Sequence, residues 1–283
     1  LVGSEMCIRD SPNTYKVTFD PDHVRWTEGV FKEEHTFDSG LGTLPTPEIY
    51  GWKFNGWWTG RNGSGAKLTS HSMVEPKDVV YYGNWSPLTY EVHFLSKVEQ
   101  PEGESVKTFT VDHTYDQAFG TLPEPEEKGY TFTGWYDGEN KKINPQTIFQ
   151  PQSGAEGYTY HAGWESNSYN IQFVYYDADG KQVVIEINRD YPSRLGTLPA
   201  PEKPGYTFVG WFKDNGEQVT AGSWVEAGDT EYKAKWKANQ YTIHFERNLP
   251  ESETMEDPED KTVTYALPIG ALPNLNETGY VFL

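Results

Sequence analysis

Pairs of acidic residues beside glycines are the first groups in this 283-residue chain that could do chemistry. The pairs are Asp137/Glu139, Asp177/Asp179 and Asp214/Glu217. Closely spaced carboxylates suit Ca²⁺, but a calcium loop also needs alternating ligands and a distant bidentate Glu. The three turn sequences differ from one another and lack that spacing. We therefore expect no metal site here and no cofactor.

The histidines do not form a metal motif. His93 and His244 stand at the same place in two related segments, where the other copies of that segment carry Thr18 and Gln172. Neutral replacements argue for an outward-facing strand position and against a metal ligand. The sequence has no His-x-x-x-His, no Cys pair and no Gly-x-Ser-x-Gly element, so nothing assembles a nucleophile, a base and an orienting group. The prediction is that the chain is not an enzyme.

Composition excludes several classes of partner. Asp plus Glu number 42 and Lys plus Arg 23, which gives a net charge of −19. Such a surface repels phosphate backbones, so we expect no nucleic-acid partner. The sequence has no run of 18 apolar residues, and we expect no membrane insertion. Aromatic residues make up 15% of the chain, too many for a disordered acidic tail.

An internal repeat organises the chain. Gly-Thr-Leu-Pro, with Ala for Thr in the last copy, begins at Gly42, Gly120, Gly196 and Gly270, at spacings of 78, 76 and 74 residues. Each complete copy continues as Gly-aromatic-x-Phe-x-Gly-Trp and closes on Tyr-x-Gly/Ala-x-Trp. Each copy also opens with alternating apolar residues, as in Tyr169/Ile171/Phe173. Three whole repeats and one shorter one are therefore expected.

Inside each repeat the apolar period is two, which indicates β-strands. In the third copy the strand-like runs are 169–173, 183–187, 206–212 and 231–236, and a hairpin turn is expected at 177–180. No stretch of ten or more residues has the period of an amphipathic helix, and the sequence leaves room only for short helical turns before the Leu-Pro element, as at 115–119. The fold class is thus mainly β, with small modules of four or five strands arranged as beads on a string.

The repeat boundaries follow from these landmarks. Residues 1–11 resemble the in-frame translation of a library adapter, so we expect them to be a non-native scar that also contains the single Cys7. The fourth copy stops before its Gly-Trp element, and we expect it not to complete its fold. The expected parts are 1–11 as the scar, 12–87 as copy 1, 88–166 as copy 2, 167–238 as copy 3 and 239–283 as copy 4. The segments that join the copies are short and polar, and we expect them to support no large interface.

Tryptophans divide into a recurring and a non-recurring group. The recurring ones are expected in the cores of the modules, and the alternative is an exposed platform for stacking sugars. They are Trp57, Trp85, Trp135, Trp164, Trp211 and Trp236. Trp26, Trp58 and Trp224 occur in one copy each and are the weaker candidates for surface contact.

The ordered motifs over residues 15–283 resemble the Listeria-Bacteroides repeat, the module called the B-repeat in internalins. Gly129-Tyr130-Thr131-Phe132-Thr133-Gly134-Trp135-Tyr136 carries the resemblance best, whereas copy 1 departs from it with Trp52 and a charged insert over 21–34. The resemblance implies β-grasp-like modules of secreted or wall-anchored bacterial proteins. Cell-wall attachment, through regions outside this fragment, is implied by the resemblance only.

The expected function is that of a non-enzymatic stalk or spacer on the bacterial cell surface. A role in adhesion is the expectation beside it. Compact-domain scaling gives each module a diameter of about 30 Å. The rival hypothesis is an array that itself binds a host glycan or host protein, with avidity raised by repetition. The fragment itself is expected to be a monomer.

Overall fold

The computed structural model describes residues 11–151, 158–247 and 256–274. The expected scar, apart from Ser11, lies outside the described residues. The chain divides into two compact units. One contains Leu1–Lys97, Val106–Pro125 and Gly134–Gly163, and the other contains Val98–Ser105, Glu126–Thr133 and Trp164–Leu283.

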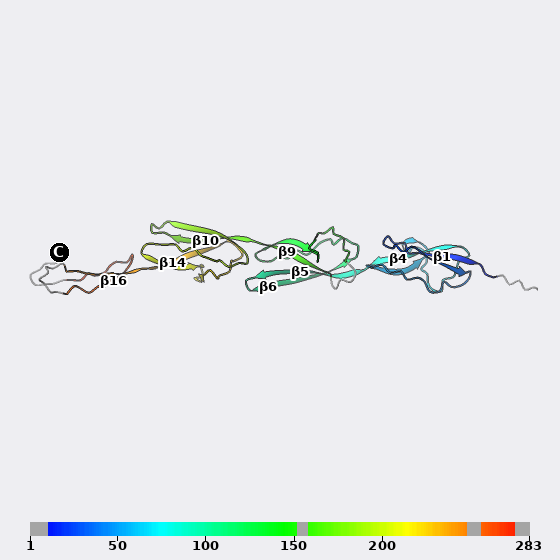
Figure 1. Ribbon diagram of the computed structural model, residues 1–283, viewed down its shortest axis with the longest axis horizontal. Helices are drawn as coiled ribbons and strands as arrows, with labels where there is room; N and C mark the ends of the chain where they lie inside the picture. Colours follow the sequence, from blue (N-terminus) through cyan, green and yellow to red (C-terminus); the bar gives the residue numbers. More distant parts are fainter. Residues whose placement is uncertain (1–10, 152–157, 248–255, 275–283) are drawn as a thin grey trace, which may run out of the picture. The chain divides into compact units, whose positions relative to one another are not determined.

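Copy 1 forms a four-stranded sheet in the order β2-β1-β4-β3, of which Figure 1 labels β1 and β4. Its strands are β1 Thr14–Asp20, β2 Phe31–Thr36, β3 Trp52–Trp58 and β4 Val79–Pro87. The opening strand β1 lies at the centre, antiparallel to β2 and parallel to the closing strand β4. One short 3₁₀ turn, η1, spans Arg61–Gly63.

Copies 2 and 3 add a short fifth strand to the same arrangement. Their sheet orders are β6-β5-β9-β7-β8 and β11-β10-β14-β12-β13. The strands of copy 2 are β5 Thr89–Gln100, β6 Gly103–Thr114, β7 Tyr130–Tyr136, β8 Lys142–Ile143 and β9 Tyr158–Ser166. Those of copy 3 are β10 Ser168–Tyr176, β11 Gln182–Asp190, β12 Tyr206–Phe212, β13 Gln218–Val219 and β14 Thr230–Ala238. The prediction of a mainly β fold built from small repeated sheets is confirmed.

The described part of copy 4 has two paired strands, β15 Gln240–Ile243 and β16 Lys261–Thr264. They correspond to the opening and second strands of the other copies. Residues 275–283 lie outside the described residues.

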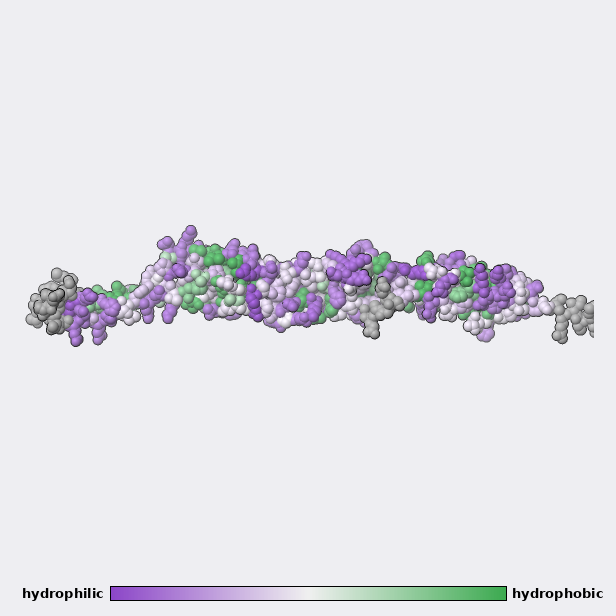
Figure 2. Space-filling view, in the orientation of Figure 1, coloured by the Kyte–Doolittle hydropathy of each residue, from purple (hydrophilic) through white to green (hydrophobic). Residues whose placement is uncertain are grey.

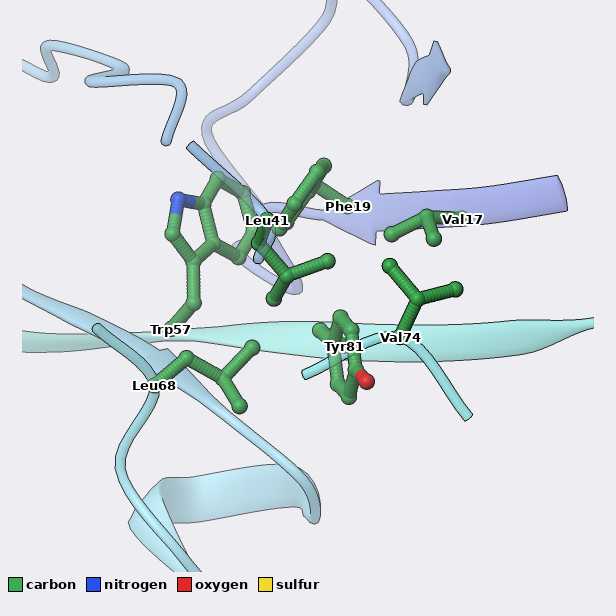
Figure 3. Packing of buried hydrophobic residues seen from close by; sticks show 7 residues of the cluster. All are labelled: Val17, Phe19, Leu41, Trp57, Leu68, Val74 and Tyr81. Carbon is green, nitrogen blue, oxygen red and sulfur yellow. The ribbon is translucent and has the colours of Figure 1, made fainter. Parts of the chain in front are cut away.

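The apolar alternation of the strands becomes the core of each module. In copy 1, Val17 and Phe19 of β1 meet Trp57 of β3 and Tyr81 of β4 (Figure 3). In copy 3, Ile171, Phe173, Trp211 and Tyr232 make the same cluster. These side chains are at most 3% exposed. Burial of several aromatic side chains supplies much of the apolar area that a module of this size can remove from water.

Two local features differ from what the sequence suggested. Residues 115–119 form a turn, in which the Gln117 amide donates to the Thr114 carbonyl, and not a helical turn. The joins between copies are not four-residue polar segments, because the flanking strands run almost to each other. One residue separates them at each join: Leu88, Asn167 and Asn239.

Candidate functional site

Two of the acidic pairs serve as turn caps. The Asp177 carboxylate accepts hydrogen bonds from the Asp179 and Lys181 amides, at 3.0 and 2.9 Å. Asp137 does the same for the Glu139 and Lys141 amides. An Asp that bonds to its own turn in this way stabilises the hairpin.

The third pair is engaged in ion pairs. Asp214 lies 2.7 Å from Lys233 Nζ, and Glu217 lies 3.0 Å from Lys213 Nζ. Across the described stretches of chain, His, Cys, Asp and Glu side chains form no group of three that could hold a metal ion. His93 lies on β5 between the buried Val92 and Phe94 and is itself half-buried.

One tryptophan of each complete copy links two of the recurring motifs. Trp57, Trp135 and Trp211 are each 1% exposed. Each indole N–H donates a 2.7 Å hydrogen bond to the proline carbonyl of the Gly-Thr-Leu-Pro element, at Pro45, Pro123 and Pro199 respectively. The hydrogen bond satisfies the one polar atom of a buried indole. The motifs recur together because they are one packing unit.

The second recurring tryptophan of each copy is half-buried. These residues, Trp85, Trp164 and Trp236, lie on the closing strand and pack against the motif phenylalanine of β3, β7 or β12. Their ring centroids lie 4.8–5.3 Å from those of Phe54, Phe132 and Phe208.

The non-recurring tryptophans are all half-buried, and they differ in setting. Trp26 packs on Phe31. Trp58 lies in β3, and its backbone forms an isolated antiparallel β-bridge with Lys67. Trp224 carries the Arg194 guanidinium 3.6 Å above its ring centroid. It also lies in the wall of a groove of about 660 Å³ within the second unit.

This groove combines an aromatic wall with polar groups. Gln100 ends β5 and Glu102 lies in the turn that follows, whereas Arg194, Lys213 and Trp224 come from copy 3. Lys213 is paired with Glu217 and with Glu226, which lies 2.9 Å away. These hydrogen bonds hold the Lys213 pKa above its usual range. Lys213 is therefore protonated at neutral pH, and the carboxylates of Glu217 and Glu226 balance its positive charge.

A second recurring site lies at each join between copies, where the backbone forms two hydrogen bonds. The linking residue donates its amide to a glycine carbonyl of the preceding copy, and its own carbonyl accepts from a tyrosine amide of the following copy. The distances run from 2.8 to 3.0 Å. The three sets are Gly51–Leu88–Tyr115, Gly129–Asn167–Tyr191 and Gly205–Asn239–Tyr265.

The tyrosine ring lies directly against the glycine. Any Cβ placed on Gly51, Gly129 or Gly205 would come closer than 3.0 Å to that ring. All three glycines have φ between 79° and 85°, a region that L side chains rarely adopt. Glycine is therefore required twice, for its backbone conformation and for the space above it. We call this glycine–tyrosine contact, with its two backbone hydrogen bonds, the joint.

Side chains complete the joint. Tyr191 packs edge-on against Tyr130 at 5.7 Å, and Tyr265 packs in the same way on Tyr206 at 5.4 Å. Tyr191 is 5% exposed, and its hydroxyl donates to Gln100. Burial raises the Tyr191 pKa, with Tyr169 adding to the effect. The phenol therefore remains protonated and continues to donate at physiological pH.

An asparagine at the linking position adds a further bond at two joints. Thr131 Oγ1 donates to Asn167 Oδ1 at 2.6 Å, and Thr207 repeats this bond to Asn239. The first joint has Leu88 and Lys53 at these places.

The charged insert of copy 1 supports the first joint instead. Arg25 forms a 2.6 Å ion pair with Asp116, and its guanidinium lies 5.7 Å from the centroid of the Tyr115 ring. The nearby His23 ring packs on Trp52 at 4.4 Å. Burial lowers the pKa of His23, and the Arg25 charge lowers it further.

The joint was not predicted from the sequence, although the sequence contains a signal for it. An aromatic residue follows the second strand of every copy, at Phe37, Tyr115, Tyr191 and Tyr265. Its recurrence together with the motif glycine marks both halves of the contact.

Comparison with known proteins agrees with this modular reading. The model of the Listeria-Bacteroides repeat domain matches residues 15–82, 90–154 and 169–235. The chain is 28% identical, over 84% of its length, to an Evansella cellulosilytica protein whose name describes it as a Gly-rich membrane protein. It is 32% identical, over 50% of its length, to internalin H of Listeria monocytogenes. It spans only 27% and 23% of those two relatives.

Proposed function

Because the chain belongs to the Listeria-Bacteroides repeat domain family, we propose that it is a non-enzymatic stalk segment of a bacterial surface protein. The observation that carries this proposal is the joint, which is built from the same atoms three times. A spacer needs folded units that couple to their neighbours. The tyrosine over the motif glycine supplies that coupling.

The surface chemistry and the relatives support an extracellular setting. Hydrophilic side chains cover most of the face seen in Figure 2, in keeping with a net charge of −19. Two relatives carry names that place them in a membrane or among internalins. The part of the chain that the structure describes contains no apolar helix of membrane-spanning length. In this proposal, attachment to the cell wall is made by other regions of a longer protein.

A surface-display experiment tests the spacer role. The chain is placed between a wall anchor and a reporter epitope, and antibody access to the epitope is compared with that of a display lacking residues 88–238. We expect access to fall when the two copies are removed. Replacing the chain by a glycine-serine linker of equal residue number is the matched control. If that linker gives the same access, folded repeats are not needed and the spacer proposal fails.

A second candidate function is glycan binding at the groove beside Trp224. Arg194 and Trp224 form an isolated β-bridge between their backbones. The same β-bridge is formed by Gly40 and Met73 in copy 1 and by Ala118 and Ile148 in copy 2. The fold therefore does not need an arginine and a tryptophan there. Arg194 covers one face of the Trp224 indole, so a sugar in the groove would use the rest of the ring surface together with the neighbouring carboxylate and amide groups as hydrogen-bond partners.

A glycan array with the Trp224→Ile variant tests this candidate. The isoleucine that copy 2 carries at this place preserves the bridge, so the fold is expected to survive. Glycan signals present with the parent chain and lost in the variant support the groove. Signals that are unchanged, or absent from both, exclude it.

A further inference from the structure

Copy 1 carries one half of a joint on its own surface. Phe37 follows β2 as Tyr115 follows β6, and the Phe37 amide donates to the Asn13 carbonyl at 2.8 Å. The Tyr115 amide makes the same bond to Leu88 at 2.8 Å. Asp38 and Asp116 continue both turns with nearly equal φ values of 60° and 62°.

The rings agree as well. Phe37 lies edge-on to Tyr15 with ring centroids 6.4 Å apart, and Tyr115 lies tilted against Tyr90 at nearly the same distance, 6.5 Å. Phe37 is 41% exposed, whereas Tyr115 and Tyr191 of the first two joints are 6% and 5% exposed; Tyr265 of the third joint, in the shorter copy 4, is 43% exposed. A ring held in the same place as the buried tyrosines thus remains open to solvent.

We infer that the surface formed by Asn13, Tyr15 and Phe37 is a docking site for the glycine-aromatic end of another repeat of this family. In the joints of this chain that end is a glycine at positive φ, with its carbonyl free to accept the linking amide. The Asn13 amide and the Phe37 ring are the complementary groups. This inference deepens the proposed function, since it names the partner that one end of the spacer accepts.

The identity of Asn13 narrows the partner further. The asparagines at the second and third joints accept from a threonine two residues after the glycine. Leu88, which cannot accept such a bond, follows a repeat with Lys53 at that place. Asn13 therefore suits a repeat with the sequence Gly-Tyr-Thr-Phe, as at Gly129 and Gly205, because that threonine can donate to its side chain. A repeat with the sequence Gly-Trp-Lys-Phe lacks the threonine.

A fusion with the full chain tests the docking site. A second copy of residues 167–238 is joined directly to Asn13, in place of residues 1–12, which reproduces the spacing of the native join before Asn239. Hydroxyl-radical footprinting then compares Phe37 oxidation with and without the added repeat. If docking lowers the exposed fraction of Phe37 from 41% to the 6% of Tyr115, Phe37 oxidation should slow about sevenfold, because the oxidation rate follows the exposed fraction of the side chain.

Two variants of the added repeat serve as controls. Gly205→Val fills the space above the glycine, and Thr207→Val removes only the hydroxyl that Asn13 would accept. We expect Gly205→Val to restore fast Phe37 oxidation and Thr207→Val to restore part of it, while tryptophan fluorescence shows whether the added repeat is folded. Unchanged Phe37 oxidation in the unmutated fusion, with Tyr115 and Tyr191 still protected, overturns the inference. Loss of protection at those two tyrosines would instead count against the joint and the spacer proposal.

Discussion

A methyl group on the glycine of the second joint should open that joint selectively. Gly129 has φ +85°, and a Cβ there would overlap the Tyr191 ring. Gly120 provides the matched control, because it has φ +68° and no atom within 4 Å of the place of its Cβ. Gly129→Ala and Gly120→Ala therefore share the backbone penalty and differ in the clash.

The free-energy cost of each substitution can be estimated from these two settings. A left-handed backbone disfavours alanine by about 1–2 kcal/mol, and the lower entropy of the unfolded alanine chain offsets about 0.4–1 kcal/mol of that. Gly120→Ala should thus cost about 1 kcal/mol. At Gly129 the overlap adds about 1–3 kcal/mol if the ring stays. If the ring leaves, the contact with Tyr130 is lost, at about 0.5–1.5 kcal/mol.

Native-state hydrogen exchange of the Tyr191 amide is the assay, because this amide donates to Asn167 within the joint. An added cost of about 0.5–3 kcal/mol, which covers both responses of the ring, corresponds to exchange faster by about 2- to 150-fold. Gly120→Ala should leave the Tyr191 amide close to its parent rate. Equal rates for Tyr191 in the two variants would refute the role assigned to Gly129.

Three further predictions concern the modules and the first joint. Trp135→Ala should lower the unfolding free energy of copy 2 by about 3–5 kcal/mol, since it empties a buried site and removes the bond to Pro123; a change below about 1 kcal/mol in urea unfolding would show that Trp135 does not hold the core. Burial lowers the pKa of His113 below its ordinary 6.5, against a smaller opposing effect of Asp112. The neutral ring is thus favoured in the folded state, so its stabilisation is present above pH 6.5 and is lost as the pH falls through the lowered pKa. The urea midpoint of copy 2 should therefore drop between pH 7 and pH 5, and less so in His113→Leu; equal slopes would contradict this reading. Arg25→Gln should weaken the first joint by less than about 1 kcal/mol, because its pair with Asp116 is partly exposed; Tyr115 amide exchange should detect the loss at low salt and not at 1 M NaCl, and a loss independent of salt would argue against the ion pair.

The strands could be predicted from the sequence because their alternation is local. In copy 3 the expected runs 169–173, 183–187, 206–212 and 231–236 lie within β10, β11, β12 and β14. The two-residue strands β8 and β13 could not be predicted, since a run of two residues has no period. They exist because β7 and β12 offer an edge to pair with.

The joint could not be predicted from the sequence for a different physical reason. Recurring glycines indicate positions of positive φ or close approach, but Gly129 and Tyr191 are far apart in sequence, and residue types alone do not tell which side chain lies above the glycine. Polar residues such as Ser166 and Ser168 favoured a short polar segment between the copies, yet they belong to β9 and β10. The Trp135–Pro123 bond was similarly hidden, although recurrence had already marked both of its residues.

In the proposed spacer a joint holds neighbouring repeats in one orientation, and residual dipolar couplings across the first joint test this most directly. Backbone amides of β1 to β4 in copy 1 and of residues 106–114 and 134–149 in copy 2 are measured in one alignment medium. We predict that a single alignment tensor fits both sets in the parent chain, and that Gly51→Val requires two. Two independent tensors in the parent chain would contradict the claim, because the repeats would then be freely jointed.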